Sequence, residues 1–263
     1  MARSFHGVSF RLPAAGALAL LALAGRASAH ERDFTISRDW HLPYAGEHEI
    51  ESRTFWDPKP NDVSQLFEYE YGITDHFAIE PGVKFLKFNA DSFKLKMVEC
   101  ELRFNFLDFA YDKLLPALNV EYEHRVGEEL EGENANPDFE AEKQAVELKG
   151  ILSWYTEKGD DFTINMNVGR LEDEEEWEWE SEVTFGYLRK LDSIGGWEPP
   201  KEHPIGVGVE FLQQFSKDKF TEIGPVVSWR ASKNLHVLMT ALYAVNHRDE
   251  HNDELRLILE WEF

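Results

Sequence analysis

Glutamates recur two residues apart in several short stretches of the sequence. Pairs of this kind are Glu68/Glu70, Glu99/Glu101, Glu121/Glu123 and Glu180/Glu182. In a β-strand, residues two apart point to the same face, so the two carboxylates of each pair would lie side by side. Their repulsion has to be relieved by a basic neighbour, water, bound cations or protonation. The pairs therefore indicate either a salt-bridge network or a surface that attracts cations.

Metal-ligating side chains gather in a second place, the run His247-Arg248-Asp249-Glu250-His251. Two imidazoles and two carboxylates this close together can coordinate Zn²⁺ or Cu²⁺. An exposed charged loop is the simpler interpretation of the same residues. A further candidate is His30, because an imidazole beside a newly formed terminal amine can chelate a metal such as copper. The candidate metal ligands are therefore His247, Asp249, His251 and His30.

The elements that would position these side chains are strands. Apolar and polar residues alternate at period two, a pattern typical of half-buried strands, along twelve stretches. These are residues 47–56, 63–74, 77–88, 93–106, 117–125, 145–156, 162–171, 177–190, 205–215, 220–230, 235–245 and 255–263. Within 93–106 the apolar residues change parity, which predicts a β-bulge near Met97. Residues 107–116 alternate less clearly and suit a helical turn.

The connections between these stretches are mostly short, so consecutive strands would pair as hairpins. An even number of strands in nearest-neighbour order suits an up-and-down antiparallel barrel with both termini on one side. Large apolar residues on one face of every strand favour a barrel surrounded by lipid over a soluble sandwich. Aromatic residues near strand ends fit the girdles of such a barrel: Trp56, Tyr71, Trp154, Tyr187, Trp229, Tyr243, Trp261 and Phe263.

If the apolar parity faces lipid, the polar parity faces the lumen. The pore candidates on that parity are Glu68, Glu70, Glu99, Glu101, Arg103, Glu121, Glu123, Arg125, Glu147, Lys149, Glu180 and Glu182. Carboxylates outnumber basic groups on this face, and acidic rings select for cations. The sequence therefore predicts a cation-preferring pore. The alternative is an interior salt-bridge network that fills a narrow barrel.

Composition narrows the class of protein further. The net charge of −23 argues against binding nucleic acid through its phosphates. The single cysteine, Cys100, allows no disulfide within the chain. After residue 30 no stretch approaches the ~20 consecutive apolar residues of a membrane helix, whereas barrel strands need only ~9–11 alternating residues.

The N-terminus has the three parts of a secretory signal peptide. Basic residues up to Arg11 precede an apolar run over 14–24, and Ala27-Ser28-Ala29 forms a small-residue cleavage site. We therefore expect a signal peptide over residues 1–29 and a mature chain that begins at about His30. Residues 30–45 would then form an N-terminal segment ahead of the first strand, which could fold into the lumen as a plug.

Patterns for catalysis are sparse. The sequence has no Walker or dinucleotide-binding pattern, no C-x-x-C and no H-E-x-x-H. His124 falls on the apolar parity and Ser153 on the polar one, so these two residues cannot form a nucleophile–base pair. A hydrolytic site at the barrel rim would have to begin with Asp249, His251 and Asp253. We expect no enzymatic activity and no cofactor.

Two motifs resemble known proteins. The strand over 255–263 alternates apolar and charged residues and stops on Phe263, which resembles the terminal signature that the assembly machinery of Gram-negative outer-membrane β-barrels reads. The stretch from Phe67 to Phe77, FEYEYGITDHF, resembles the E-Y-G-L-T-D hairpin of uncharacterised proteobacterial outer-membrane proteins. These include transporters grouped near the phenol-degradation barrel family. The resemblance implies an outer-membrane location and a transport-like role, and it assigns no site residue.

The sequence thus predicts an all-β fold, a transmembrane up-and-down antiparallel β-barrel of about twelve strands. The acidic loops 127–141, 171–176 and 246–253 would lie outside the cell. We predict a passive outer-membrane channel or transporter for a small solute, with cations favoured. The alternative is a closed-lumen barrel that serves as a structural or surface-binding module, with metal as one possible ligand. Expected partners are outer-membrane lipid, the barrel-assembly machinery through Phe263, and a small solute or cation, but not nucleic acid.

Overall fold

The described part of the chain folds entirely into strands and their connections. The computed structural model describes residues 34–58, 62–87, 92–126, 144–173, 176–191, 204–215, 219–246 and 253–263. The strands are β1 (His48–Asp57), β2 (Asp62–Thr74), β3 (Phe77–Lys87), β4 (Lys94–Asn105), β5 (Leu114–Arg125), β6 (Gln144–Tyr155), β7 (Asp160–Asp173), β8 (Glu176–Leu191), β9 (Ile205–Gln214), β10 (Thr221–Arg230), β11 (Leu235–Ala244) and β12 (Glu254–Glu262). Within these ranges we find no helix with the length and apolar character needed to span a membrane.

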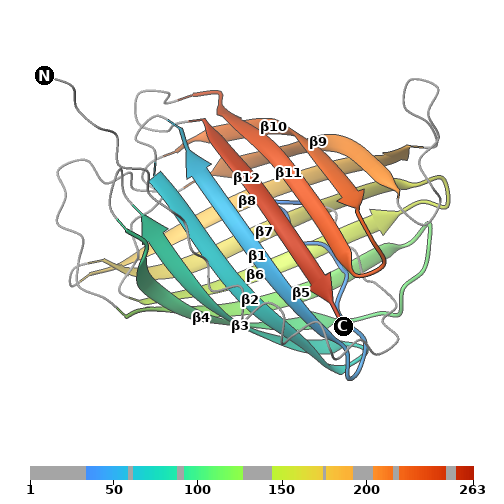
Figure 1. Ribbon diagram of the computed structural model, residues 1–263, viewed down its shortest axis with the longest axis horizontal. Coiled ribbons are helices and arrows are strands. Elements are labelled where there is room, and N and C mark those ends of the chain that lie inside the picture. Colours follow the sequence, from blue (N-terminus) through green and yellow to red (C-terminus); the bar gives the residue numbers. More distant parts are fainter. Residues whose placement is uncertain are drawn as a thin grey trace, which may run out of the picture.

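All twelve strands belong to one closed sheet (Figure 1). Each strand pairs antiparallel with its neighbours in sequence, and β1 closes the ring by pairing with β12, from Glu49 opposite Glu262 to Trp56 opposite Leu255. Closure gives the backbone of every strand a partner on both sides and leaves no open edge, as a barrel in lipid requires. The predicted fold, an antiparallel barrel of twelve strands, is confirmed.

The irregularity predicted near Met97 is present in β4. Lys84 of β3 pairs with Met97, and the next pair is Phe85 with Leu95, so one residue of β4 is left over. Both Lys96 and Met97 are buried, whereas Leu95 is exposed. The bulge therefore changes the parity of the strand, so that apolar residues on both sides of it face outward.

The prediction of a helical turn over 107–116 is wrong. The described residues between β4 and β5 form bends and turns, with a left-handed backbone at Asp112 (φ 55°), and β5 already begins at Leu114. The amide of Asp112 donates to the carbonyl of Tyr155 at 2.8 Å. The connection is thus fixed to the neighbouring strand β6 by a long-range backbone hydrogen bond, which local periodicity does not encode.

The outer face of the barrel is apolar and aromatic. Exposed side chains on this face include Phe67, Leu148, Ile164, Met166 and Met239. Among the predicted girdle residues, Trp56, Trp154, Trp229 and Tyr243 are exposed near strand ends. An apolar band bordered by aromatic side chains is the surface that outer-membrane barrels present to lipid.

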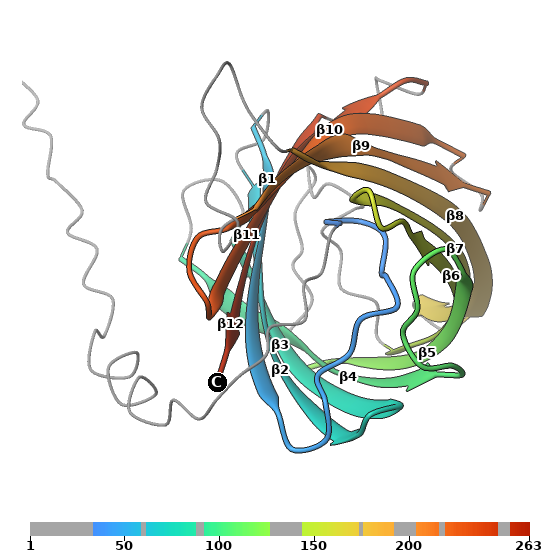
Figure 2. The ribbon, with the colours of Figure 1, turned by 90° about the vertical axis from the view of Figure 1, so that its right-hand side faces the viewer.

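The inner face is polar, and it encloses residues that precede the first strand. Figure 2 shows the strands as a ring around the blue segment that leads into β1. We call residues 34–46 the lumen segment. We call the end of the barrel where β1 begins and β12 ends the terminal end, and the opposite end the loop end.

Candidate functional site in the barrel lumen

The first part of the lumen segment is bound to the wall formed by β7, β8 and β9. The hydroxyl of Thr35 donates to Glu210 Oε2 at 2.5 Å, and the amide of Ile36 donates to Glu210 Oε1 at 2.7 Å. The backbone N–H of Arg38 donates to Asn165 Oδ1 at 2.6 Å. The side-chain Nδ2 of Asn165 donates to the backbone carbonyl of Arg38 at 2.7 Å. Side chains of the wall thus satisfy backbone groups that no strand partner reaches.

A glycine makes room for the start of this segment. The ring of Phe34 lies over Gly186 of β8 and packs with Leu188 and Val226. A Cβ at position 186 would come within 2.5 Å of the Phe34 ring. Gly186 therefore permits the close approach of the lumen segment to the wall.

The side chain of Arg38 reaches across the lumen to the opposite wall. Its Nη2 lies 3.2 Å from Glu68 Oε1, 3.1 Å from Glu80 Oε1 and 3.5 Å from Glu101 Oε2. Burial opposes the charged form, but Glu101, Glu80 and Glu68 outweigh it and hold the pKa of Arg38 well above its ordinary value. Since these glutamates lie on β2, β3 and β4, Arg38 joins two walls that are distant in the ring of strands.

The second part of the segment is held near the terminal end. Asn105 donates to the carbonyl of Trp40, and Arg103 donates to the carbonyl of His41, each at 2.7 Å. The hydroxyl of Tyr155 lies 3.1 Å from His41 Nδ1. The indole of Trp40 belongs to an apolar cluster with Leu115, Ala117, Ile151 and Tyr155. Both parts of the segment are therefore attached to the barrel wall.

Four of the predicted pore residues belong to this buried network. Glu68 and Glu101 contact Arg38, and Arg103 Nη1 lies 2.6 Å from Glu70 Oε2. Their exposed fractions are between 2% and 5%. Inward-facing side chains on other strands around the segment are equally buried: Glu80, Ser153, Asn165, Glu210, Leu238 and Ile258. In this conformation the described residues leave little open lumen at the level of Arg38.

The other predicted pore residues lie nearer the loop end. Oxygens of Glu99, Glu121 and Glu123 come within 4.8 Å of one another. Lys149 Nζ lies 3.0 Å from Glu147 and 3.9 Å from Glu121. Three further members stand opposite inward positions of the neighbouring strands: Glu182 accepts a bond of 2.9 Å from Asn167, Glu180 pairs with Gly169, and Arg125 pairs with Met97. We call Glu99, Glu121 and Glu123 the acidic patch.

Some predicted site residues cannot be placed. His30, His247, Asp249 and His251 lie outside the described residues. The predicted separation of His124 from Ser153 agrees with the strand register. His124 pairs with Val98 near the loop end, and Ser153 is buried beside Thr163.

Sequence reasoning missed the residues that join the segment to the walls. Arg38 falls within the predicted plug over 30–45, but its position there predicts no role, and nothing in the sequence sets Glu210 of β9 apart from the other glutamates of the strands. The available signal was an arginine placed in a mixed apolar and polar stretch just before the first strand. Because the lumen is rich in carboxylates, an arginine side chain that enters it is expected to pair with glutamates.

One hydrogen-bonded series in the lumen has the form of a nucleophile, a base and a carboxylate. Ser228 Oγ lies 2.8 Å from His236 Nε2, and His236 Nδ1 lies 2.7 Å from Glu260 Oε2. All three residues are at least nine-tenths buried. The pocket that Glu260 lines is lined by neither Ser228 nor His236. The arrangement therefore satisfies a buried histidine, whose two ring nitrogens both have partners within the barrel.

Known proteins resemble this chain in structure. No family model matches the sequence, and no curated protein matches it. The KdgM porin superposes with a TM-score of 0.55 at 8% identity, over 82% of this chain and 99% of the porin. The NanC porin superposes with a TM-score of 0.51 at 10% identity, over 81% of this chain and 100% of the porin. An outer membrane channel from Pseudomonas putida F1 superposes with a TM-score of 0.55 at 9% identity, over 88% of this chain and 100% of the channel. The chain therefore has the fold of outer-membrane porins and channels.

Proposed function

We propose that this protein is a passive outer-membrane channel for a small solute, and that the lumen segment closes it in the conformation described here. The observation that carries this proposal is how the lumen is filled. Near the terminal end the space is occupied by residues 34–46, which belong to none of the strands. Such a segment can leave without breaking the sheet. The channel would then open when Arg38 separates from Glu68, Glu80 and Glu101.

The location in the outer membrane is part of the same proposal. The apolar, aromatic exterior and the resemblance of the fold to the KdgM and NanC porins support it. We further propose that residues 1–29 direct the chain across the inner membrane and are removed near Ala29. The assembly machinery would recognise the strand that ends at Phe263, as it does in the Gram-negative outer-membrane barrels whose terminal signature this strand resembles.

The acidic patch supports a preference for cations. A KdgM porin has been solved in complex with disordered oligogalacturonate, a polyanion. In this chain Glu99, Glu121 and Glu123 face the lumen, and their negative potential would repel such a ligand. A small cationic or neutral solute therefore fits this lumen better than an acidic oligosaccharide. The proposal includes no catalytic step.

Conductance across a planar bilayer tests the proposal. We expect the refolded chain to open stably and, under a KCl gradient, to show a reversal potential that favours K⁺. Replacement of Glu99, Glu121 and Glu123 by glutamine should shift the reversal potential toward zero. The matched control is the triple substitution Asp108→Asn, Asp112→Asn and Glu157→Gln, which removes the same charge from exposed positions in the connections between strands. It should leave selectivity nearly unchanged.

The burial of the Arg38 network favours a second candidate, a barrel with a permanently closed lumen that serves as a scaffold or surface-binding module. Charges bound this deeply on two walls resist displacement. A correctly folded barrel that never conducts would exclude the channel and support this second function. Equal reversal potentials for the wild type and the acidic-patch variant would exclude the cation preference alone.

A further inference from the structure

Among the residues that the structure describes, three groups of glutamates bring carboxylate oxygens within 4.8 Å of one another in the lumen. The group Glu51, Glu68 and Glu80 surrounds Arg38 and Arg53, so its charge is compensated. The acidic patch lies nearer the loop end, where two of its members are only partly buried and water can solvate them. Neither group requires a bound ion.

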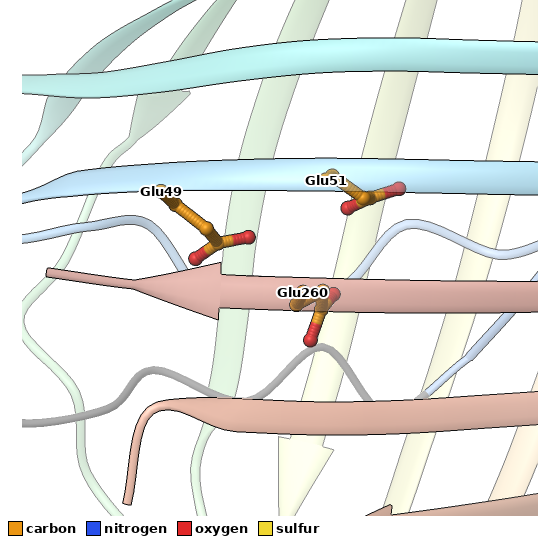
Figure 3. A group of neighbouring side chains, drawn as sticks. All are labelled: Glu49, Glu51 and Glu260. Carbon is orange, nitrogen blue, oxygen red and sulfur yellow. The ribbon is translucent and has the colours of Figure 1, made fainter. Parts of the chain in front are cut away.

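The third group is Glu49, Glu51 and Glu260, which lies at the junction of β1 and β12. Figure 3 shows Glu49 and Glu51 projecting from β1, beside Glu260 of the neighbouring strand. Glu51 stands directly opposite Glu260 in the strand register, and Glu49 is two residues before Glu51 on the same face. Like charges placed opposite each other destabilise a sheet unless something compensates them.

Two members of this group are fixed by basic neighbours. Glu51 pairs with Arg53, and Glu260 Oε2 lies 2.7 Å from His236 Nδ1. These contacts hold the two carboxylates in place, so the orientation of the oxygens that are not bound to Arg53 or His236 is also fixed.

Glu49 differs from the other two. It is 6% exposed, and within the described chain its side chain forms no hydrogen bond or ion pair. Its cross-strand neighbours are also acidic, Glu262 on one side and Glu70 on the other. The side chain lines a small pocket, open to solvent on one side, that Glu51 and Glu260 also line. Arg38 and Arg103 line the same pocket, but their guanidinium groups are paired with Glu68, Glu80, Glu101 and Glu70. A buried carboxylate in such surroundings calls for a cation.

The chemistry of the three ligands selects the kind of cation. All three are carboxylates, which favour hard ions such as Ca²⁺ and Mg²⁺ over Zn²⁺ or Cu²⁺. Oxygens on opposite sides of Ca²⁺ are about 4.8 Å apart and those around Mg²⁺ about 4.1 Å, from their usual bond lengths. The ligand oxygens of the three residues lie within 4.8 Å of one another, so one hard cation can contact all three. Solvent in the pocket can supply the remaining ligands.

We propose that Glu49, Glu51 and Glu260 bind a Ca²⁺ ion inside the barrel. The ion would join the first strand to the last one, at the seam where the ring of strands closes. Binding would therefore stabilise the folded barrel by linkage. The site is independent of conduction, because it exists in the closed conformation and its occupancy can be measured in detergent micelles without any channel activity.

Calorimetric titration with CaCl₂ tests the site on the full chain, refolded in detergent and freed of metal with EDTA. We expect one Ca²⁺ to bind per barrel and to raise the melting temperature, with Mg²⁺ binding more weakly. Glu49→Gln should lower the Ca²⁺ affinity by about tenfold or more, since affinity follows the charge of the ligands. The control Glu182→Gln, which removes the same charge from another lumen position, should bind as the wild type does.

A second readout separates the site from general effects on folding. In EDTA, Glu49→Gln should melt at a higher temperature than the wild type, because it removes a repulsive charge. Glu49→Asp keeps the charge but withdraws its oxygens, so it should lose affinity without this gain in melting temperature. Absence of wild-type binding at millimolar Ca²⁺ would overturn the proposal. So would wild-type affinity in Glu49→Gln, which would place the ion elsewhere, for example in the acidic loops.

Discussion

Three buried glutamates from three strands share one guanidinium at Arg38. Its Nη2 lies within 3.5 Å of Glu68, Glu80 and Glu101, and the side chains of all four residues are at most 3% exposed. Water cannot replace the guanidinium at such a site without a change in packing. The contribution of Arg38 thus consists mainly of preventing uncompensated buried charge.

Removal of that charge should be costly. We expect Arg38→Met to lower the free energy of unfolding by about 3–5 kcal/mol, the usual result of deleting one partner of a buried ionic group. Urea unfolding in detergent micelles, followed by tryptophan fluorescence, measures the difference. The control Arg189→Met removes an arginine that pairs with Asp160 near the surface, and it should cost at most about 1 kcal/mol. Equal effects of the two substitutions would show that the Arg38 network does not stabilise the barrel.

In β4, one extra residue adjusts the strand to the apolar exterior and the polar lumen of the barrel. The extra residue at the bulge lets Leu95 face outward before it, and Val98 and Cys100 face outward after it. After the bulge, the glutamates of β4 occupy the positions between these outward-facing residues, so their side chains face the lumen. The side of the sheet on which Glu101 lies thus depends on the number of residues in β4.

Deletion of single residues from β4 tests this dependence. Deletion of Met97 removes the bulge but keeps every other side chain on its present face, so the barrel should still fold. Cys100 lies outside the bulge, so its deletion shifts the rest of β4 by one residue. Glu101, Arg103 and Asn105 would then point toward lipid, and folding should fail. The altered mobility of folded barrels in unheated gel electrophoresis distinguishes the outcomes. Similar yields of folded protein from both deletions would contradict the argument.

For the whole molecule, the sequence was sufficient for the barrel wall but not for its contents. Twelve strands were predictable because each alternates apolar and polar residues over its own length, and the bulge followed from a change of parity. The bond between Thr35 and Glu210 joins residues 175 positions apart. No local pattern encodes such a contact, and inward-facing glutamates are too numerous to show which one receives the segment. The Ser228, His236 and Glu260 series was equally hidden, because its members lie on three strands.

The lumen segment and the barrel form one functional unit if the segment is the gate. Ser37 Oγ and Thr184 Oγ1 lie 3.0 Å apart, so cysteines at these two positions should form a disulfide between the segment and β8. The natural Cys100 is replaced by serine to leave a single possible pair. We expect the oxidised barrel not to conduct, and addition of dithiothreitol to the bilayer chamber to restore wild-type conductance.

The single substitutions Ser37→Cys and Thr184→Cys, each with Cys100→Ser, serve as controls and should conduct with or without reductant. Full conductance through the oxidised double variant would mean that ions pass beside a fixed segment, and that the lumen segment narrows the pore but does not gate it. Because the disulfide holds the segment near Arg38 without altering any charge of the network, the result depends on movement of the segment alone. Opening by displacement of 34–46 is thus a property of the whole barrel, which neither the charge of Arg38 nor the register of β4 can decide.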